Sequence, residues 1–482
     1  MNMGLVLVLI DYFPRCTGVN LKKLKRVFLP LLIGAIASLG FAPFSLWIAP
    51  VLALFALFQI LIKSIPTERI IITYFFGLGI LLPAQHWTGV YVGNLPWLVL
   101  CLMQALFFIP LALVSKQRSF TNPLIFATSL VLSETLMRTM PFTGFGWSRL
   151  GFTQVGSPFA NLYPILGVTG VAFLIALTAS LRKIKHISIL LIFLVAINSI
   201  PLELAKGNQI KIALVQGGVS KLGLSFNAKP TEVYQNHLKQ SRLNIKPNTV
   251  DLIIWPENAV DIDIFKNDKV MAELIELSRN LDTPILVGGI SRKSGSLENI
   301  SILFNPYIES VYTKRYLTPF GEYIPLRNLV SKFSNLANSV SDFSAGSERV
   351  IFKTKNSSFE TLICYELLND VFRDDLNSGI LVVQTNNATF GDTAQLAQLR
   401  NIAQVRALET SREIAYVSTT GITSFIDSEG VIKSEIPKFL PGVLIDEIQL
   451  VEGKTLAAKL RFYPEVAAFI LLLFLLIRRR GN

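Results

Sequence analysis

Long apolar segments without charge fill most of the chain up to about residue 205. The first, residues 27–62, is nearly twice the roughly 20 residues that one helix needs to cross a bilayer, and Gly40 and Pro43 interrupt it. We therefore predict two helices there, joined by a turn at residues 40–47. Single crossings are predicted at residues 70–92, 97–114, 123–137, 163–181 and 187–204. Seven crossings thus precede the polar half, and an apolar run at residues 466–477 predicts an eighth.

The basic residues around these segments predict the topology. They cluster before the first segment, at residues 22–26, and after the last, at residues 478–480. The loops predicted to be cytoplasmic carry Lys63 and Arg69, Lys116 and Arg118, and Arg182, Lys183 and Lys185. The loops predicted to lie outside, residues 43–46 and 93–96, carry no charge, as the positive-inside rule requires. We therefore expect both termini in the cytoplasm and the polar half outside it.

The polar half alternates between short β-prone runs and longer amphipathic runs. Strands are predicted at residues 210–216, 250–255, 284–288, 358–364 and 380–384, and helices at residues 231–243, 270–281 and 395–412. This alternation predicts α/β layers. The expected organisation is an N-terminal extension at residues 1–20, a membrane bundle at 21–205, an α/β domain at 206–462 and a last membrane helix at 463–482.

Composition narrows the class of protein. Hydrophobic residues make up 51% of the chain and charged residues only 16%, which is too apolar for a wholly soluble protein. The net charge of +12 does not predict nucleic-acid binding, because many basic residues flank apolar segments. The three cysteines, Cys16, Cys101 and Cys364, predict no disulfide framework. Cys364 would then be an unpaired thiol outside the cytoplasm, which suggests a chemical use.

Three reactive side chains stand at the ends of β-prone runs in the polar half. They are Glu257, Lys314 and Cys364, and the ends of strands are where α/β proteins place their ligands. A cysteine nucleophile needs a proton acceptor. Histidine is disfavoured, because His86 and His186 lie at membrane segments and His237 lies in a predicted surface helix.

A carboxylate is therefore the expected base. A partly desolvated pocket can raise the pKa of Glu257 enough for it to take the thiol proton. Lys314 and the backbone N–H that follows Cys364 would stabilise an oxyanion. No metal or other cofactor is expected, since the chain has no cluster of cysteine and histidine with ligand spacing.

Several motifs carry a resemblance to a known family. WPE at residues 255–257, the stretch from Lys314 to PFGEYIP, and ICYE at residues 363–366 resemble the Glu, Lys and Cys set of the nitrilase superfamily. In combination with a membrane bundle, the chain resembles the bacterial apolipoprotein N-acyltransferase family. GFAPFSLW at residues 40–47, GWSRLGFTQ at 146–154, VQGG at 215–218 and TNNATFGD at 385–392 follow that family in the same order.

The resemblance implies an α-β-β-α sandwich on about eight membrane helices, facing the periplasm from the bacterial inner membrane. It implies Glu257 as proton acceptor, Lys314 as stabiliser of the intermediate and Cys364 as nucleophile. Glu322, Tyr365 and Glu366 match supporting residues of the family. The implied reaction moves an acyl chain from a phospholipid to a diacylglyceryl lipoprotein through a thioester, and we expect the enzyme to act as a monomer.

Substrate contacts are less well marked in the sequence. The loop at residues 141–158 holds Trp147 and a single arginine, Arg149; it predicts either an interfacial aromatic belt or a lipid-facing wall with Arg149 near a phosphate. Phe226 and Phe390 are further candidates for lipid contact. Thr389 stands where family members commonly have an aromatic residue, and only Phe226 lies near the position of a family tryptophan.

Two rival functions remain open at this stage. One is a membrane-tethered carbon–nitrogen hydrolase that uses the same three residues on a small amide. The other is a transporter whose outer domain only binds a ligand. Charges within the crossings are few, and Glu134 and Arg138 are spaced i,i+4, which predicts a structural pair rather than a proton relay.

Overall fold

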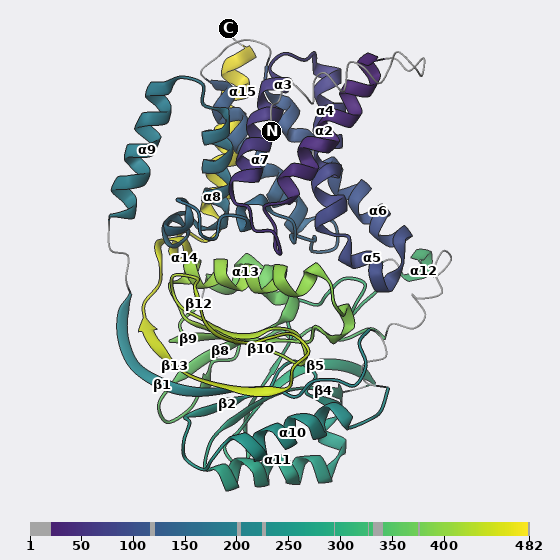
Figure 1. Cartoon of the computed structure of the whole chain (residues 1–482), viewed down its shortest axis with the longest axis vertical. Helices are drawn as coiled ribbons and strands as arrows, with labels where there is room; N and C mark the ends of the chain where they lie inside the picture. The colour runs from purple at the N-terminus through teal and green to yellow at the C-terminus, as the bar shows by residue number, and fades with distance from the viewer. Residues whose placement is uncertain are drawn as a thin grey trace.

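The chain folds into a helical bundle and a two-sheet α/β domain that lie against each other (Figure 1). The computed structural model describes residues 21–115, 121–199, 204–223, 228–293, 295–325, 327–330, 341–374 and 376–480. The predicted N-terminal extension at residues 1–20 lies outside the described residues.

The bundle contains most of the predicted membrane segments as helices. Its elements are α2 (Leu21–Ser38), α3 (Ile48–Leu61), α4 (Pro66–Ala84), α5 (Trp87–Val92), α6 (Asn94–Ala105), the 3-10 helix η2 (Leu106–Leu113), α7 (Thr121–Thr139), α8 (Tyr163–Ser180), α9 (Ile184–Asn198) and α15 (Tyr463–Arg480). Two helices, α2 and α3, meet at residues 39–47, which confirms the predicted turn. The apolar helices fit a membrane protein.

Not all of these helices could cross a bilayer alone. Among the described residues, three helical segments are long and apolar enough: Pro66–Ala84, Asn94–Leu113 and Ala160–Ser180. α7 and α15 are of similar length but less apolar, because they carry charged residues. The count of eight crossings therefore stays a prediction. The segment predicted at residues 70–92 contains a helix long and apolar enough to cross, α4, but the predicted end is wrong, since α4 ends at Ala84 and a separate helix, α5, begins at Trp87.

The α/β domain is built on two sheets, one with seven strands and one with six. One has the strand order β13-β1-β2-β4-β5-β6, with β3 beside β4, and the other has the order β12-β11-β10-β9-β8-β7. The first comprises β1 (Ala205–Gln216), β2 (Leu252–Ile254), β3 (Val260–Asp263), β4 (Ile285–Lys293), β5 (Ser296–Phe304), β6 (Ile308–Thr313) and β13 (Gly442–Glu452). The second comprises β7 (Phe352–Lys353), β8 (Ser358–Ile363), β9 (Ile380–Thr385), β10 (Ile414–Ser418), β11 (Thr423–Ile426) and β12 (Ile432–Ile436).

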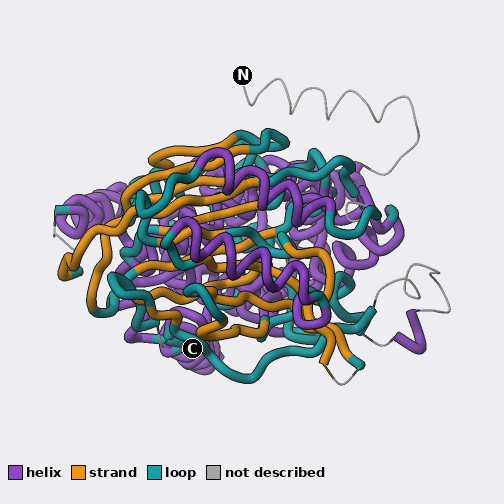
Figure 2. Tube along the Cα trace, turned by 90° about the horizontal axis from the view of Figure 1, so that it is seen from below, coloured by secondary structure: helices purple, strands orange, loops and turns teal. Residues whose placement is uncertain are grey.

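Helices cover the outer face of each sheet, which confirms the α-β-β-α order. α10 (Glu232–Asn244) and α11 (Asp268–Leu281) pack on the first sheet, far from the bundle, and lie in front of the strands in Figure 2. α13 (Ala394–Thr410) lies between the second sheet and the bundle (Figure 1). β8 and β9 are parallel neighbours and almost fully buried, as their apolar sequences predicted.

A polar side chain joins the two sheets inside the sandwich. Gln384 of β9 accepts hydrogen bonds from Ser301 of β5 and Thr361 of β8, at 2.5 and 2.9 Å, and donates to the carbonyl of Trp255 at 2.6 Å. Because a buried amide must be fully bonded, this residue fixes how the sheets lie relative to each other. The residues that follow β2 and β8 are thereby held in register.

His237 lies in the outer helix α10, as predicted, but its side chain is fully buried on the inner side of that helix, where Nδ1 lies 2.8 Å from the carbonyl of Val233. One prediction about polar residues is wrong. Glu134 and Arg138 do not pair with each other. Glu134 instead lies 3.5 Å from Arg149, and Arg138 lies 2.9 Å from Glu465 of α15. Each of the two side chains is thus paired with a residue of another element.

Candidate active site

The three predicted reactive residues come together at one end of the sandwich. Glu257 follows β2, Lys314 follows β6 directly, and Cys364 follows β8 directly. All three side chains are buried, with 5%, 1% and 8% of their surface exposed. The site therefore combines a thiol, an ammonium group and a carboxylate in a nearly dry environment, where electrostatic interactions are strong.

Cys364 sits on a sharp turn between a strand and a helix. Its φ of 51° is in the left-handed region, and a 3-10 helix, η7 (Cys364–Leu368), starts there. Residues other than glycine adopt this conformation at a cost of about 1–3 kcal/mol, and such strain is typical of functional positions. The Sγ atom lies 3.5 Å from Oγ1 of Thr385. Burial, with the nearby Glu257, raises the pKa of the thiol to about 12.

Glu257 is held by donors on both of its oxygens. Oε1 accepts from Nδ2 of Asn299 at 2.8 Å and lies 3.5 Å from Nζ of Lys314. Oε2 accepts from the backbone N–H of Asn386 at 2.7 Å. Burial raises the pKa of Glu257 above its ordinary value, although the charge of Lys314 acts in the opposite direction.

Lys314 has a closer acidic partner than Glu257. Its Nζ lies 2.7 Å from Oε2 of Glu322, and Glu322 also accepts from Asn299 and from the backbone N–H of Thr318, both at 2.8 Å. Burial opposes the charge of Lys314, but Glu322 and Glu257 together raise its pKa. Lys314 in turn lowers the pKa of Glu322 against the effect of burial. Lys314 and Glu322 therefore stay charged as a pair.

This environment separates the roles of two neighbouring carboxyl groups. Glu322 is ionised and neutralises Lys314, whereas the pKa of Glu257 is raised toward the range in which a carboxylate exchanges protons. Glu257 can therefore act as a proton acceptor for a thiol that is itself protonated at neutral pH. Lys314 keeps a positive charge that can stabilise a developing oxyanion.

Glu366 links the cysteine turn to the lysine segment. Its Oε2 accepts from the N–H of Ile363, and its Oε1 accepts from the N–H of Arg315 and the hydroxyl of Tyr312, at 2.8, 2.8 and 2.7 Å. One buried carboxylate thus ties the residue before Cys364 to the residue after Lys314. This contact explains how an acid two residues after the nucleophile supports the site.

Tyr365 joins the site to the bundle. Its hydroxyl donates to the carbonyl of Gly144 at 3.0 Å, and its ring stacks on Phe145, with centroids 5.9 Å apart. Phe145 stacks in turn on Trp147 at 6.0 Å. The residue after the nucleophile therefore lies against the loop between α7 and α8.

The four predicted substrate residues lie in different surroundings. Trp147 is buried and donates to Gln398 of α13 at 2.6 Å, and Phe390 is half-buried against Trp87, with ring centroids 5.3 Å apart. Phe226 lies outside the described residues. Arg149 is only 1% exposed, and Asp370 neutralises it through bonds of 2.9 Å. A phosphate contact by Arg149 is therefore not supported by its position, because the side chain is buried and its charge is neutralised inside the protein.

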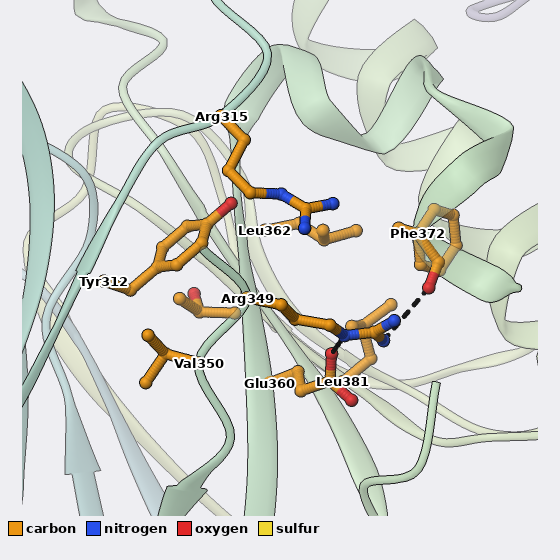
Figure 3. A pocket seen from close by; sticks show the side chains of 9 residues that line it. Tyr312, Arg315, Arg349, Val350, Glu360, Leu362, Phe372 and Leu381 are labelled. Atoms are coloured by element: carbon orange, nitrogen blue, oxygen red, sulfur yellow. Dashed lines mark hydrogen bonds and ion pairs between the residues drawn. The ribbon is translucent and has the colours of Figure 1, made fainter. Parts of the chain in front are cut away.

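A small cavity lies among Tyr312, Arg315 and Arg349 (Figure 3). It is lined by Tyr312, Arg315, Arg349, Val350, Glu360, Thr361, Leu362, Phe372 and Leu381. Arg349 is paired with Glu360 and donates to the carbonyl of Phe372 at 3.1 Å. With about 20 Å³ the cavity holds roughly one water molecule, so it is too small for an acyl chain.

Several residues of the site carry no sequence signal. Asn299 lies within β5 and bonds both Glu257 and Glu322, while Thr385 ends β9 beside the thiol. Asn386 acts through its backbone N–H, which any residue but proline supplies. Of these, only Thr385 and Asn386 fall in a stretch that the family resemblance marked. In the part of the chain that the structure describes, no three His, Cys, Asp or Glu side chains lie together as a metal site needs.

The fold and the site define an enzyme of the carbon–nitrogen hydrolase type. The family model described as carbon-nitrogen hydrolase matches residues 211–458, and the model described as apolipoprotein N-acyltransferase N-terminal domain matches residues 33–181. The chain belongs to the apolipoprotein N-acyltransferase family.

Full-length relatives agree with these matches. The apolipoprotein N-acyltransferase of Wigglesworthia glossinidia brevipalpis is 26% identical over 94% of this chain and 98% of its own length. That of Shewanella oneidensis is 29% identical over 91% of this chain and 93% of its own length. A solved structure of a CN-hydrolase superfamily protein from Xanthomonas campestris covers 56% of this chain and 97% of its own chain, at 18% identity and a TM-score of 0.39.

Proposed function

We propose that this protein moves a fatty acyl chain from a phospholipid to the free α-amine of the N-terminal diacylglyceryl-cysteine of a lipoprotein. The observation that carries the proposal is a buried thiol with a raised pKa beside Glu257 and Lys314, on a domain that packs against apolar helices. A protonated thiol needs a base in the attack step, and a base with a raised pKa stands within the same buried cluster.

In the first half of the reaction, Cys364 gives its proton to Glu257 and its sulfur attacks the ester carbonyl of the phospholipid. The carbonyl oxygen becomes an oxyanion that Lys314 and the backbone N–H of Tyr365 stabilise. The intermediate then collapses, the carbon–oxygen bond breaks, and the leaving alkoxide takes the proton from Glu257. The products are a lysophospholipid and a thioester on Cys364.

In the second half, the amine of the lipoprotein attacks the thioester. Glu257 takes a proton from the attacking nitrogen, and the carbon–sulfur bond breaks. Cys364 leaves as a thiolate and recovers its proton from Glu257, so the site returns to its starting state. A thioester is reactive enough to acylate an amine, which gives a thiol an advantage over a hydroxyl here.

The bundle has a physical role in this scheme. Both substrates are anchored in a bilayer, and extracting an acyl chain costs about 0.8 kcal/mol per CH₂. A site next to membrane helices avoids most of that cost. On the basis of the charge pattern of the loops, we place the catalytic domain in the periplasm, with eight crossings and both termini in the cytoplasm.

Mass spectrometry of the purified protein tests the proposal. After incubation with phospholipid, the wild type should gain one acyl group on Cys364, and a Cys364→Ala variant should gain none. Addition of a peptide with an N-terminal diacylglyceryl-cysteine should then remove the acyl group and transfer it to the peptide. Absence of the adduct from the wild type, or its persistence in the variant, would refute the mechanism.

The same experiment distinguishes the rival functions. A carbon–nitrogen hydrolase of small amides would let water reach its thioester, and supplied phospholipid would leave Cys364 unacylated. A transporter would form no covalent adduct at all. Either result would replace acyl transfer as the function of the site.

A further inference from the structure

One loop of the bundle holds both ends of the segment that carries the nucleophile. The segment is residues 364–370, and the loop is residues 141–158 between α7 and α8. At the first end, Tyr365 bonds the carbonyl of Gly144 and stacks on Phe145. At the other end, Arg149 donates to both carboxylate oxygens of Asp370 at 2.9 Å.

A second arginine holds the same segment from the side of the α/β domain. Arg406 of α13 donates to the carbonyls of Leu367 and Leu368, at 2.9 and 3.2 Å, and to Asp370 at 2.7 Å. Asp370 thus lies between Arg406 of the catalytic domain and two arginines of the bundle, Arg149 at 2.9 Å and Arg138 at 3.4 Å. The 3-10 helix that begins at Cys364 ends within reach of these guanidinium groups.

These residues belong to a larger buried cluster of charges. It comprises Glu134, Arg138, Arg149, Asp370, Arg373, Arg406, Glu409 and Glu465. Apart from Arg138, whose side chain is 15% exposed, the ion-paired side chains have at most 7% of their surface exposed. Buried ion pairs add little net stability but can fix one geometry, because every alternative leaves a charge unpaired. The cluster is suited to setting a position.

We propose that Arg149 and Asp370 are positioning residues through which the membrane bundle sets the place of Cys364. The inference rests on the proposed acyl transfer, because it concerns the rate of that chemistry. Reaction rates are sensitive to the placement of the reacting atom, and a displacement of about 1 Å can lower the rate about 10²-fold. Cys364 is separated from Asp370 only by one short helical turn, so a movement of Asp370 is passed on to the thiol.

Asp370 does not act through its own titration. Burial opposes its charge, but Arg149 and Arg406 hold the pKa of its carboxyl well below the usual range. Asp370 therefore stays ionised at every pH at which the enzyme would work. Its replacement should lower the rate without moving the pH profile, which distinguishes it from a residue of the proton-transfer step.

The test measures acylation of Cys364 in the full-length protein, reconstituted in vesicles of phosphatidylethanolamine. In Asp370→Asn and Arg149→Gln, the rate at saturating lipid should fall about tenfold or more, with unchanged half-saturation and an unchanged pH midpoint. Arg149→Lys, which keeps the charge, should recover most of the rate. The control Glu465→Gln removes a carboxylate of the same cluster that, among the described residues, bonds Arg138 and Thr169 but neither Arg149 nor Asp370, and should stay within about twofold of the wild type.

The outcomes separate a failure of the proposed acyl transfer from a failure of the positioning role. A wild type that forms no adduct refutes the proposed function itself. A wild type that reacts normally, together with Asp370→Asn and Arg149→Gln at the wild-type rate, overturns the positioning role. An equal loss in Glu465→Gln also overturns it, because the cluster would then matter only for packing. If Arg149→Gln does not fold, Asp370→Asn decides, because it breaks the same ion pair and a wild-type rate in that variant contradicts the inference.

Discussion

Replacement of Glu322 by glutamine should change the pH dependence of the enzyme. The substitution keeps the shape of the side chain but removes its charge. In the wild type, Oε2 of Glu322 lies 2.7 Å from Nζ of Lys314, whereas Glu257 lies 3.5 Å from the same atom. In Glu322→Gln, Lys314 has Glu257 as its only close carboxylate among the described residues, and we expect it to move onto Glu257.

The size of the effect follows from these distances. An opposite charge within about 4–6 Å lowers the pKa of a carboxyl group by about 1–3 units. Glu322 raises the pKa of Glu257 at present, so its removal acts in the same direction as the approach of Lys314. The pKa of Glu257 should therefore fall by about one unit or more. Lys314 would also leave the position from which it stabilises the oxyanion. Loss of one oxyanion donor lowers the catalytic rate about 10²–10³-fold.

The assay is the rate of thioester formation on Cys364, measured by mass spectrometry from about pH 4 to pH 9. A base must be deprotonated to act, so activity is lost as the pH falls through the pKa of Glu257. The acid limb of Glu322→Gln should lie at lower pH than that of the wild type, and its plateau about 10²-fold lower. Glu298→Gln is the matched control, because Glu298 is adjacent to Asn299 but bonds Ser291 outside the site. An acid limb that does not move would refute the assignment of Glu257 as base.

Three further predictions concern the parts around the site. Gln384→Leu should destabilise the domain by about 2–4 kcal/mol, since the hydroxyls of Ser301 and Thr361 lose their buried acceptor; an unchanged thermal midpoint would contradict this. Alkylation of Cys364 by iodoacetamide should rise steadily from neutral to alkaline pH, because its pKa is about 12; a plateau near pH 7 would exclude a protonated thiol. Gly144→Ala should slow acylation, as its φ is +71° and a Cβ would lie 2.2 Å from backbone atoms; a normal rate would show that this turn relaxes freely.

The grouping of the three proposed catalytic residues could be predicted because each follows a local pattern. Glu257, Lys314 and Cys364 each come after a β-prone run, and the ends of strands meet at one edge of a sandwich. The supporting groups could not be found in this way. Asn299 lies inside a strand among apolar residues, and nothing in its neighbourhood along the chain indicates that it bonds two carboxylates.

The role of Arg149 could not be predicted because its partner is distant in sequence. A lone arginine in an aromatic loop at a membrane surface is a reasonable lipid contact. Its true neighbour, Asp370, is 221 residues away, and only the packing of the two halves brings them together. The partners of Glu134 and Arg138 could not be predicted for the same reason. Their i,i+4 spacing suggested that they pair with each other, but each is paired with a residue of another element.

α13 lies at the junction between the α/β domain and the bundle, and its position explains how buried charges there can fix the two parts relative to each other. The helix is buried on both sides, because the second sheet covers one face and the bundle the other. Asp370, Arg373, Arg406 and Glu409 belong to the catalytic domain, and Glu134, Arg138, Arg149 and Glu465 belong to the helices and loop of the bundle. Each set holds two arginines and two carboxylates, so neither half attracts the other by net charge. Apolar packing alone would tolerate sliding, whereas paired charges in a dry interface fit in one register only. Such a junction is suited to holding a strained nucleophile at a fixed place relative to the membrane.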